Sequence, residues 1–312
     1  MKIRPQWINQ KELYETRGGS VVERTEFLSE LKEAIVRKRG YGVGRAGISE
    51  QFWMYYPILL NENANKTRLR VFERYMRFHG YSRSGIFPAQ TDFYLEYNTR
   101  YIESIRKLDL FSMILDPVMG PRIIDYYNID NKIIYYKDLI PDRSSPSNED
   151  NCYLHFFENK KLLLVCPFAD LLAQRATKET FECVWSKTGK SWFFPRSVDS
   201  LEFPYGFAIE THKKYSNALA LLEAISAELA RRDFDIALIA ASGLSIPIVS
   251  IVKQMKRIGM NLGGDLQVLF GVKGNRWRGR ERWQRDYFND WWIDMPEKYK
   301  PKEKGFSKGP YW

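Results

Sequence analysis

The fold class is indicated by the stretch FDIALIAASGLS, residues 234–245. Its short apolar run is typical of a strand that is buried on both faces, and the small residues after it predict a turn into a helix. Before this stretch, apolar side chains spaced for one helix face run from Asn217 to Arg232. Pro247 stands where the first turn of the next helix is expected, and there its missing N–H costs nothing. The pattern therefore alternates helix, strand and helix.

The same alternation is found on both sides of this stretch. Lys161–Val165 is another apolar run, ended by Pro167 and followed by a segment that suits a helix. Met260–Leu262 is expected to be a third strand, after which Gly263 and Gly264 allow a sharp turn. Strands that alternate with helices at this spacing predict an α/β fold with a Rossmann-like, doubly wound parallel sheet.

The first half of the chain is predicted to be largely helical. Apolar side chains recur at intervals of three and four residues around Phe27–Ile35 and around Tyr94–Leu108. Between these segments, three glycines within residues 42–47 predict a tight turn that leads into a helix. The polar, proline-bearing segment 140–150 is the expected boundary or long surface loop.

We therefore distinguish two portions that are expected to form one integrated catalytic domain. Residues 1–150 are the mainly helical portion and carry an R-x-G-x-x-E segment. Residues 151–312 are the Rossmann-like, nucleotide-binding portion and end in a basic, Trp-rich region.

The composition excludes several classes of protein. The 312 residues carry a formal net charge of +10, and 44% are hydrophobic and 15% aromatic, which is far more than a disordered chain carries. No apolar run approaches the length of a membrane-spanning helix, and Met1–Trp7 lacks the apolar region of a signal peptide, so a cytoplasmic location is expected. Three cysteines do not suggest a disulfide framework.

Loops that follow the predicted strands should converge on one crevice, since ligands of open α/β sheets bind beyond the carboxyl ends of the strands. Small residues there expose backbone N–H groups that can hold a phosphate. By spacing alone, tight packing turns are about as plausible as phosphate cradles, because neither GxGxxG nor a P-loop is present. The candidate nucleotide-binding residues in these loops are Pro167, Phe168, Ser242, Gly243, Asn261, Gly263, Gly264 and Asp265.

The segment 272–285, VKGNRWRGRERWQR, has six basic side chains and one acidic side chain. Such a segment suits a nucleic-acid backbone, a sugar-nucleotide diphosphate, an anionic lipid surface or merely a solvated face. Lys273 and Arg276 directly follow a predicted ligand loop, so we assign them to a small anionic ligand. The remaining arginines are expected to be mainly solvated.

Residues 262–277, LGGDLQVLFGVKGNRW, resemble the LGG-x-LQ-x-LFG-x-KG-x-RW signature of GT-D-type glycosyltransferase-like proteins of surface-polysaccharide biosynthesis loci. The terminal GPYW of residues 309–312 is similar to the family's G-C-Y-W ending. KLLLVCPF of residues 161–168 resembles its strand with a Pro-Phe turn, and Gly85–Pro88 resembles its G-x-F-P segment. The resemblance extends over most of the chain from about Gly44.

The resemblance implies a glycosyltransferase that moves a sugar from a nucleotide-diphosphate donor, with a UDP-sugar favoured, to a glycan, lipid-linked or protein-linked acceptor. It also implies a cytoplasmic enzyme that can contact the membrane peripherally, with no nucleic-acid partner. The alternatives are a nucleic-acid-binding module that uses the basic, Trp-rich region, and a noncatalytic scaffold of a polysaccharide assembly complex.

One segment departs from the family. Better characterised GT-D enzymes carry R-F-G-D-G-E, whose D-x-E carboxylates serve a divalent metal, whereas this chain has RAGISE at residues 45–50, with Ile48 in place of the first carboxylate. Mn²⁺ or Mg²⁺ with the donor diphosphate stays open, and no metal ligand is assigned. Glu50 is the expected catalytic carboxylate or a surface residue in a first helical turn, and Arg45 is a catalytic residue or its structural partner. Asp265 touches a sugar hydroxyl or caps a helix.

Overall fold

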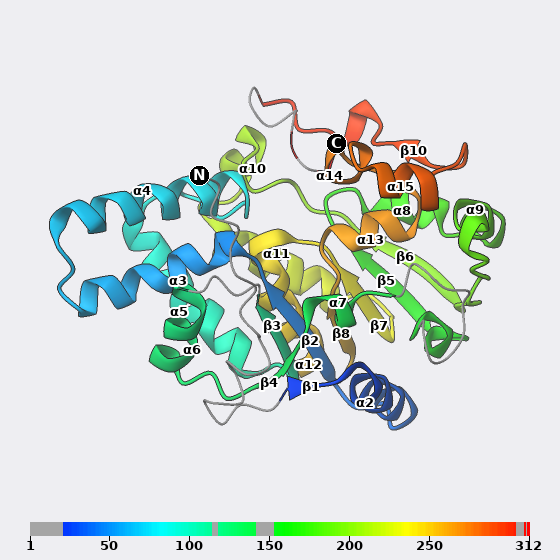
Figure 1. Cartoon of the computed structure of the whole chain (residues 1–312), viewed down its shortest axis with the longest axis horizontal. Coiled ribbons are helices and arrows are strands. Elements are labelled where there is room, and N and C mark those ends of the chain that lie inside the picture. The colour runs from blue at the N-terminus through cyan, green and yellow to red at the C-terminus, as the bar shows by residue number, and fades with distance from the viewer. Residues whose placement is uncertain (1–20, 114–117, 142–152, 304–308, 310) are drawn as a thin grey trace.

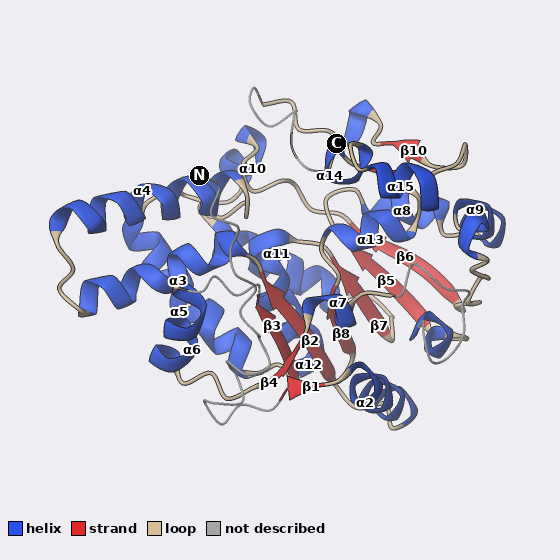
Figure 2. Ribbon diagram, viewed as in Figure 1, coloured by secondary structure: helices blue, strands red, loops and turns tan. Residues whose placement is uncertain are grey.

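The computed structural model describes residues 21–113, 118–141, 153–303, 309 and 311–312. Its centre is an eight-stranded sheet in which every paired strand runs parallel to its neighbours (Figures 1 and 2). In spatial order the strands are β1 (Val21–Val22), β4 (Lys132–Ile134), β3 (Leu110–Met113), β2 (Tyr41–Ala46), β8 (Ile258–Asn261), β7 (Ile236–Ile239), β5 (Lys161–Val165) and β6 (Ser197–Leu201). The predicted α/β fold with a Rossmann-like parallel sheet is confirmed.

Helices cover both faces of the sheet (Figure 2). The longer α-helices are α2 (Arg24–Val36), α3 (Ile48–Asn61), α4 (Lys66–Ser82), α5 (Thr91–Arg106), α6 (Met119–Tyr127), α11 (Ala218–Ala230) and α12 (Ser245–Gln254). Shorter ones are α7 (Tyr136–Leu139), α8 (Ala169–Arg175), α9 (Lys178–Val184), α10 (Ile209–Lys214), α13 (Gly264–Leu269), α14 (Asn275–Arg278) and α15 (Glu281–Asp286). A second, parallel pair joins β9 (Val272–Lys273) to β10 (Ile293–Asp294).

The core consists of two apolar clusters, one on each face of the sheet. Alternate strand side chains point to opposite faces, so Leu162 and Leu164 of β5 join one cluster while Leu163 and Val165 join the other. All four side chains are fully buried. This double burial explains why the strand appears in the sequence as a continuous apolar run rather than as an alternating pattern.

The predicted helices around residues 27–35, 94–108 and 217–232 are confirmed as α2, α5 and α11. Asn217 caps α11, with its side-chain oxygen accepting a hydrogen bond from the Ala220 amide at 2.9 Å. The predicted apolar strands likewise form β5, β7 and β8, and Pro247 lies in the first turn of α12.

The predicted tight turn at residues 42–47 is wrong. Tyr41–Ala46 is the central strand β2, paired with both β3 and β8, and α3 starts directly after Gly47. The glycines serve packing rather than turning. A methyl group on Gly42 would lie 3.3 Å from Val249 of α12, and one on Gly44 would lie 2.5 Å from Leu108 and 3.1 Å from Ile246 of α12. Small residues in β2 therefore let α12 approach the sheet closely.

The first half of the chain contributes β1–β4 to the same sheet that β5–β8 complete, in addition to its helices. The predicted boundary at 140–150 lies outside the described residues from residue 142 onward, as does Met1–Trp7. Within the described ranges, the structure has no helix with the length and apolar character needed to cross a bilayer.

Candidate active site

A cleft of about 740 Å³ lies at the carboxyl ends of the central strands. Residues one or two positions beyond the ends of four of these strands line it, namely Gly47 after β2, Pro167 after β5, Ala240 after β7 and Gly263 after β8. The C-terminal part of α4, residues 203–207 and the C-terminal Tyr311 and Trp312 form the other walls. In Figure 1 these strand ends point towards the top of the view, where the C-terminus lies.

Most of the residues predicted from the sequence come together here. The predicted residues that line the cleft are Arg45, Glu50, Pro167, Phe168, Ser242, Asn261, Gly263, Gly264 and Arg276. Gly243, Asp265 and Lys273 are not among the lining residues. Gly243 is buried beneath the cleft, where its amide donates to the Ser84 carbonyl at 3.0 Å. Lys273 lies on β9 with its ammonium group 3.8 Å from the Asp294 carboxylate.

Glu50 lies in the first turn of α3, yet only 8% of its surface is exposed. The Ser84 hydroxyl donates a hydrogen bond to its carboxylate at 2.8 Å. Burial raises the pKa of Glu50, and the Ser84 hydroxyl, nearby backbone amides and Arg45 offset only part of this effect. The surface-glutamate alternative is therefore wrong, because Glu50 is a buried carboxyl group at the cleft wall.

Arg45, at the end of β2, forms its ion pair with Asp265 rather than with Glu50. The guanidinium group lies 3.1 Å from the Asp265 carboxylate, both side chains are 8% exposed, and the ring of Tyr136 lies 4.1 Å away. Asn261 donates to the Arg45 carbonyl at 3.0 Å and accepts from the Gly263 amide at 3.1 Å. Asp265 does not cap α13, whose N-cap is Gly263. These groups hold β2, β8 and α13 together beneath the cleft.

Two long helices begin at the cleft. The N-terminal residues of α3 and α12 line it, and the partial positive charge at a helix N-terminus favours an anion. Ser242, just before α12, takes a left-handed φ of +47°, which is uncommon for a non-glycine residue and is found preferentially at functional sites. The cleft is therefore electrostatically suited to a negatively charged ligand.

Arg276 supplies a side-chain cation to the cleft, which Arg45 and Arg83 also line. It lies against the rings of Tyr311 and Trp277, with its guanidinium carbon 5.1 Å and 5.7 Å from the two ring centres. No carboxylate among the described residues pairs with Arg276, whereas Arg278 of the same helix pairs with Asp294 at 2.8 Å. Arg276 is thus the basic residue of the Trp-rich segment that faces the cleft.

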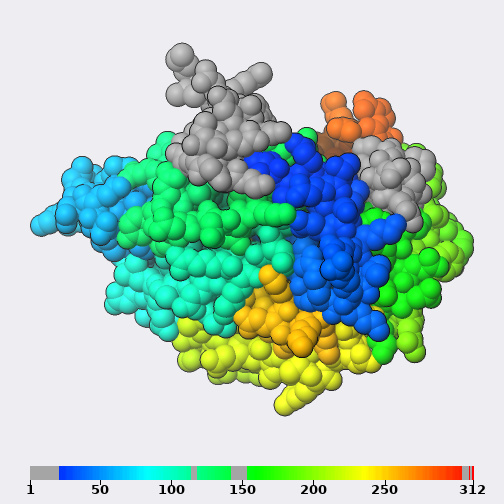
Figure 3. Space-filling view, turned by 90° about the horizontal axis from the view of Figure 1, so that it is seen from below, coloured from blue at the N-terminus to red at the C-terminus, as the bar shows by residue number. Residues whose placement is uncertain are grey.

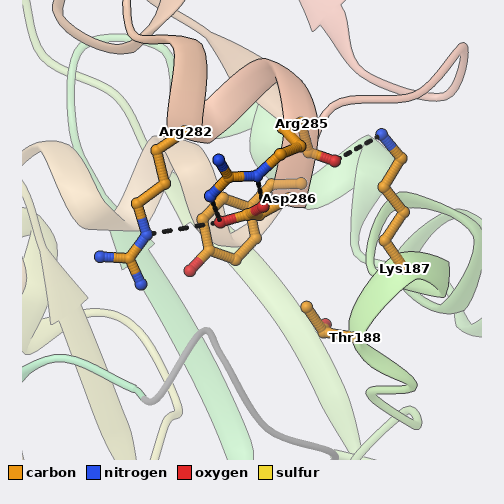
Figure 4. Close-up of a pocket in the computed structure, with 6 residues that line it drawn as sticks. Lys187, Thr188, Arg282, Arg285 and Asp286 are labelled. Atoms are coloured by element: carbon orange, nitrogen blue, oxygen red, sulfur yellow. Dashed lines mark hydrogen bonds and ion pairs between the residues drawn. The ribbon is translucent and has the colours of Figure 1, made fainter.

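In the rest of the Trp-rich segment, the Trp side chains are buried and two of the arginines form ion pairs with the adjacent Asp286. Trp277 and Trp283 are 3% and 4% exposed, so their rings are not available for stacking against bases. Arg282 and Arg285 both contact Asp286, at 3.4 Å and 2.6 Å, beside a surface hollow of about 480 Å³ (Figure 4). These exposed pairs contribute little to stability.

Several groups at the cleft, among them Ser84, His79, Tyr136 and Tyr311, were not predicted as site residues from the sequence. Ser84 directly precedes the G-x-F-P segment, and this adjacency was the only signal for it. His79 stacks on Phe52 at 5.0 Å between ring centres, and burial lowers its pKa, so its imidazole is mainly neutral at pH 7. Tyr136 comes from a segment with no recognisable motif, whereas Tyr311 belongs to the GPYW ending, to which no site residue was assigned.

The cleft does not fit a divalent metal bound by protein carboxylates. Among the described lining residues Glu50 carries the only side-chain carboxylate, its raised pKa makes it a weak ligand, and Asp265 is engaged by Arg45. The described part of the chain contains no cluster of three or more histidine, cysteine or acidic side chains that could hold a metal ion.

The chain was compared with known proteins at three levels. No protein-family model, no curated protein and no solved structure matches it significantly.

Proposed function

We propose that the protein is a GT-D-like glycosyltransferase that takes a sugar from a nucleotide-diphosphate donor, with a UDP-sugar favoured, and passes it to a glycan or glycolipid acceptor. The observation that carries the proposal is the convergence, in one cleft at the strand ends, of the buried carboxyl of Glu50, the guanidinium of Arg276 and two helix N-termini. The resemblance of residues 262–277 to the GT-D signature supports it independently.

In the proposed reaction, the acceptor oxygen attacks the anomeric carbon while the bond from that carbon to the diphosphate oxygen breaks. The Glu50 carboxylate accepts the proton of the acceptor hydroxyl, and a raised pKa makes it a stronger base than an exposed glutamate. Arg276 and the N-terminus of α12 stabilise the charge that develops on the departing nucleoside diphosphate. No step requires a protein-bound metal.

The proposal is tested by a thermal-shift screen of UDP-, GDP-, CMP- and dTDP-sugars followed by a donor-hydrolysis assay. A donor that binds the native state raises the melting temperature according to its concentration relative to Kd. Absence of any shift and of hydrolysis would favour the noncatalytic scaffold.

Arg276→Ala is expected to weaken donor binding by about 1–3 kcal/mol, the usual contribution of a charge-assisted hydrogen bond to phosphate. Lys273→Ala is the matched control, because Lys273 belongs to the same signature but does not line the cleft. Isothermal titration calorimetry with the donor identified by the screen measures both variants. Equal losses would mean that the diphosphate reaches β9, outside the cleft described here.

Ser84→Ala is expected to move the acidic limb of the pH profile of kcat/KM to higher pH. The Ser84 hydroxyl stabilises the charged form of Glu50, so its removal raises the carboxyl pKa further and the base is lost at a higher pH. Ser82→Ala is the control, since the Ser82 hydroxyl also lies at the cleft but donates to the Phe78 carbonyl. An unmoved limb in Ser84→Ala would show that Glu50 does not titrate in the rate.

A further inference from the structure

The outward face of α4 carries an apolar stripe that the fold leaves uncovered. Val71, Tyr75 and Phe78 are 45%, 49% and 58% exposed and lie at positions i, i+4 and i+7 of one helix face. The opposite face is buried through Met76 and Gly80. The helix is therefore anchored on its inner side, while Tyr75 of the stripe stacks on Phe52 of α3 at 5.6 Å between ring centres and still leaves about half of its surface exposed.

Basic side chains flank this stripe. Between residues 66 and 83 the chain has one acidic residue, Glu73, whose carboxylate accepts a hydrogen bond from Thr91. The basic residues of this stretch, apart from His79, are Lys66, Arg68, Arg70, Arg74, Arg77 and Arg83. Arg70 and Arg74 are exposed, and no carboxylate among the described residues pairs with either. An exposed apolar stripe with unpaired arginines along one side is the pattern of a helix that lies at the surface of an anionic membrane.

The hairpin of α3 and α4 projects from the body of the molecule, at the left of Figure 1 and again in the light blue region of Figure 3. A bilayer can therefore reach the α4 face without meeting the rest of the fold. Phe78, His79 and Ser82 of the same helix line the cleft, so the stripe continues into its mouth.

We infer that the α4 face, defined by Val71, Tyr75 and Phe78 with Arg70 and Arg74 beside them, docks the protein on an anionic phospholipid bilayer. The apolar side chains enter the boundary between headgroups and acyl chains while the guanidinium groups bind lipid phosphates. A nucleic acid fits less well, since an aliphatic side chain such as that of Val71 in the stripe can neither bind a phosphate nor stack on a base. The docking does not depend on the chemistry proposed for the cleft.

The test is co-sedimentation of the full chain with vesicles of phosphatidylcholine, with and without phosphatidylglycerol. We expect binding only to the anionic vesicles, weakened by salt. The double variant Arg70→Glu, Arg74→Glu should bind the anionic vesicles at least about 20-fold more weakly, because two basic residues that each contribute to binding at an anionic surface are lost. Val71→Ser leaves the charge unchanged and should weaken binding several-fold.

The matched control is Arg282→Glu, Arg285→Glu, which changes the net charge by the same four units on exposed arginines of α15. It should bind vesicles almost as well as the unaltered protein, and circular dichroism should report the same fold for all variants. Failure to bind anionic vesicles, or equal losses in both double variants, would overturn the docking surface. Binding of an oligonucleotide that needs Arg70 and Arg74, without vesicle binding, would assign the face to nucleic acid instead.

Discussion

Glu50→Gln is expected to lower turnover by about 10²–10⁴-fold while the donor still binds, because a general base typically contributes a factor of this size and the amide keeps the shape of the carboxyl group. Turnover is measured as release of nucleoside diphosphate, and donor binding by calorimetry. Unchanged turnover would remove Glu50 from the proposed reaction.

The same substitution should stabilise the fold above neutral pH. Burial raises the pKa of Glu50, so the folded state holds a proton that the unfolded state has lost between the two pKa values, and stability falls as pH rises through this window. Glutamine does not titrate, so the variant does not lose stability in this way. Glu50→Gln should therefore melt higher than the unaltered protein at pH 8, with the difference shrinking on acidification.

Glu179→Gln serves as the control for both measurements. Glu179 also lies in the first turn of a helix, α9, but its side chain is exposed. Its substitution should leave turnover and melting temperature nearly unchanged, both at pH 8 and on acidification. A stabilisation of equal size in both variants would mean that the effect comes from net charge rather than from the burial of Glu50.

Gly263→Ala should destabilise the protein by roughly 2–5 kcal/mol and abolish donor binding, since it adds backbone strain to overpacking. Gly263 has φ +51° and ψ −134°, a conformation that residues with a Cβ rarely adopt. A methyl group there would also collide with the Arg45 guanidinium and displace it from Asp265. Urea unfolding measures the change in the free energy of unfolding.

Gly279→Ala is the corresponding control. Gly279 follows α14 with φ −83°, and an added methyl group would meet nothing within 4 Å. Its substitution should change the free energy of unfolding by less than about 0.5 kcal/mol. If Gly263→Ala were equally mild, the close contact between α13 and Arg45 would not contribute to the stability of the cleft.

The failures of the sequence reading have a common physical origin in long-range packing. The glycines of residues 42–47 resemble a turn because glycine is permissive locally, yet Gly42 and Gly44 lie in a strand and make room for Leu108 and for α12, which begins about two hundred residues further along the chain. Similarly, the alternation of Trp and Arg in residues 272–285 suggested a binding surface, whereas tertiary packing buries the indoles.

The class of fold and the place of the candidate site could be predicted from local patterns in the sequence. The continuous apolar runs at 162–165 and 236–239 require burial on both faces, which a parallel sheet between helices provides. Pro167 after the first run and the small residues after the second mark the carboxyl ends of the strands. Both properties are local, so they can be recognised without knowledge of the partners.

Which side chains come together at the cleft depends on the tertiary structure. The partner of Arg45 is Asp265, 220 residues away in the sequence. The hydroxyl that donates a hydrogen bond to Glu50 of α3 comes from Ser84, which lies after α4. Arg276 and Lys273 stand three residues apart in one motif, yet only Arg276 lines the cleft. Pairing, burial and the pKa of Glu50 depend on distances across the sheet, and local spacing in the chain carries no information about those distances.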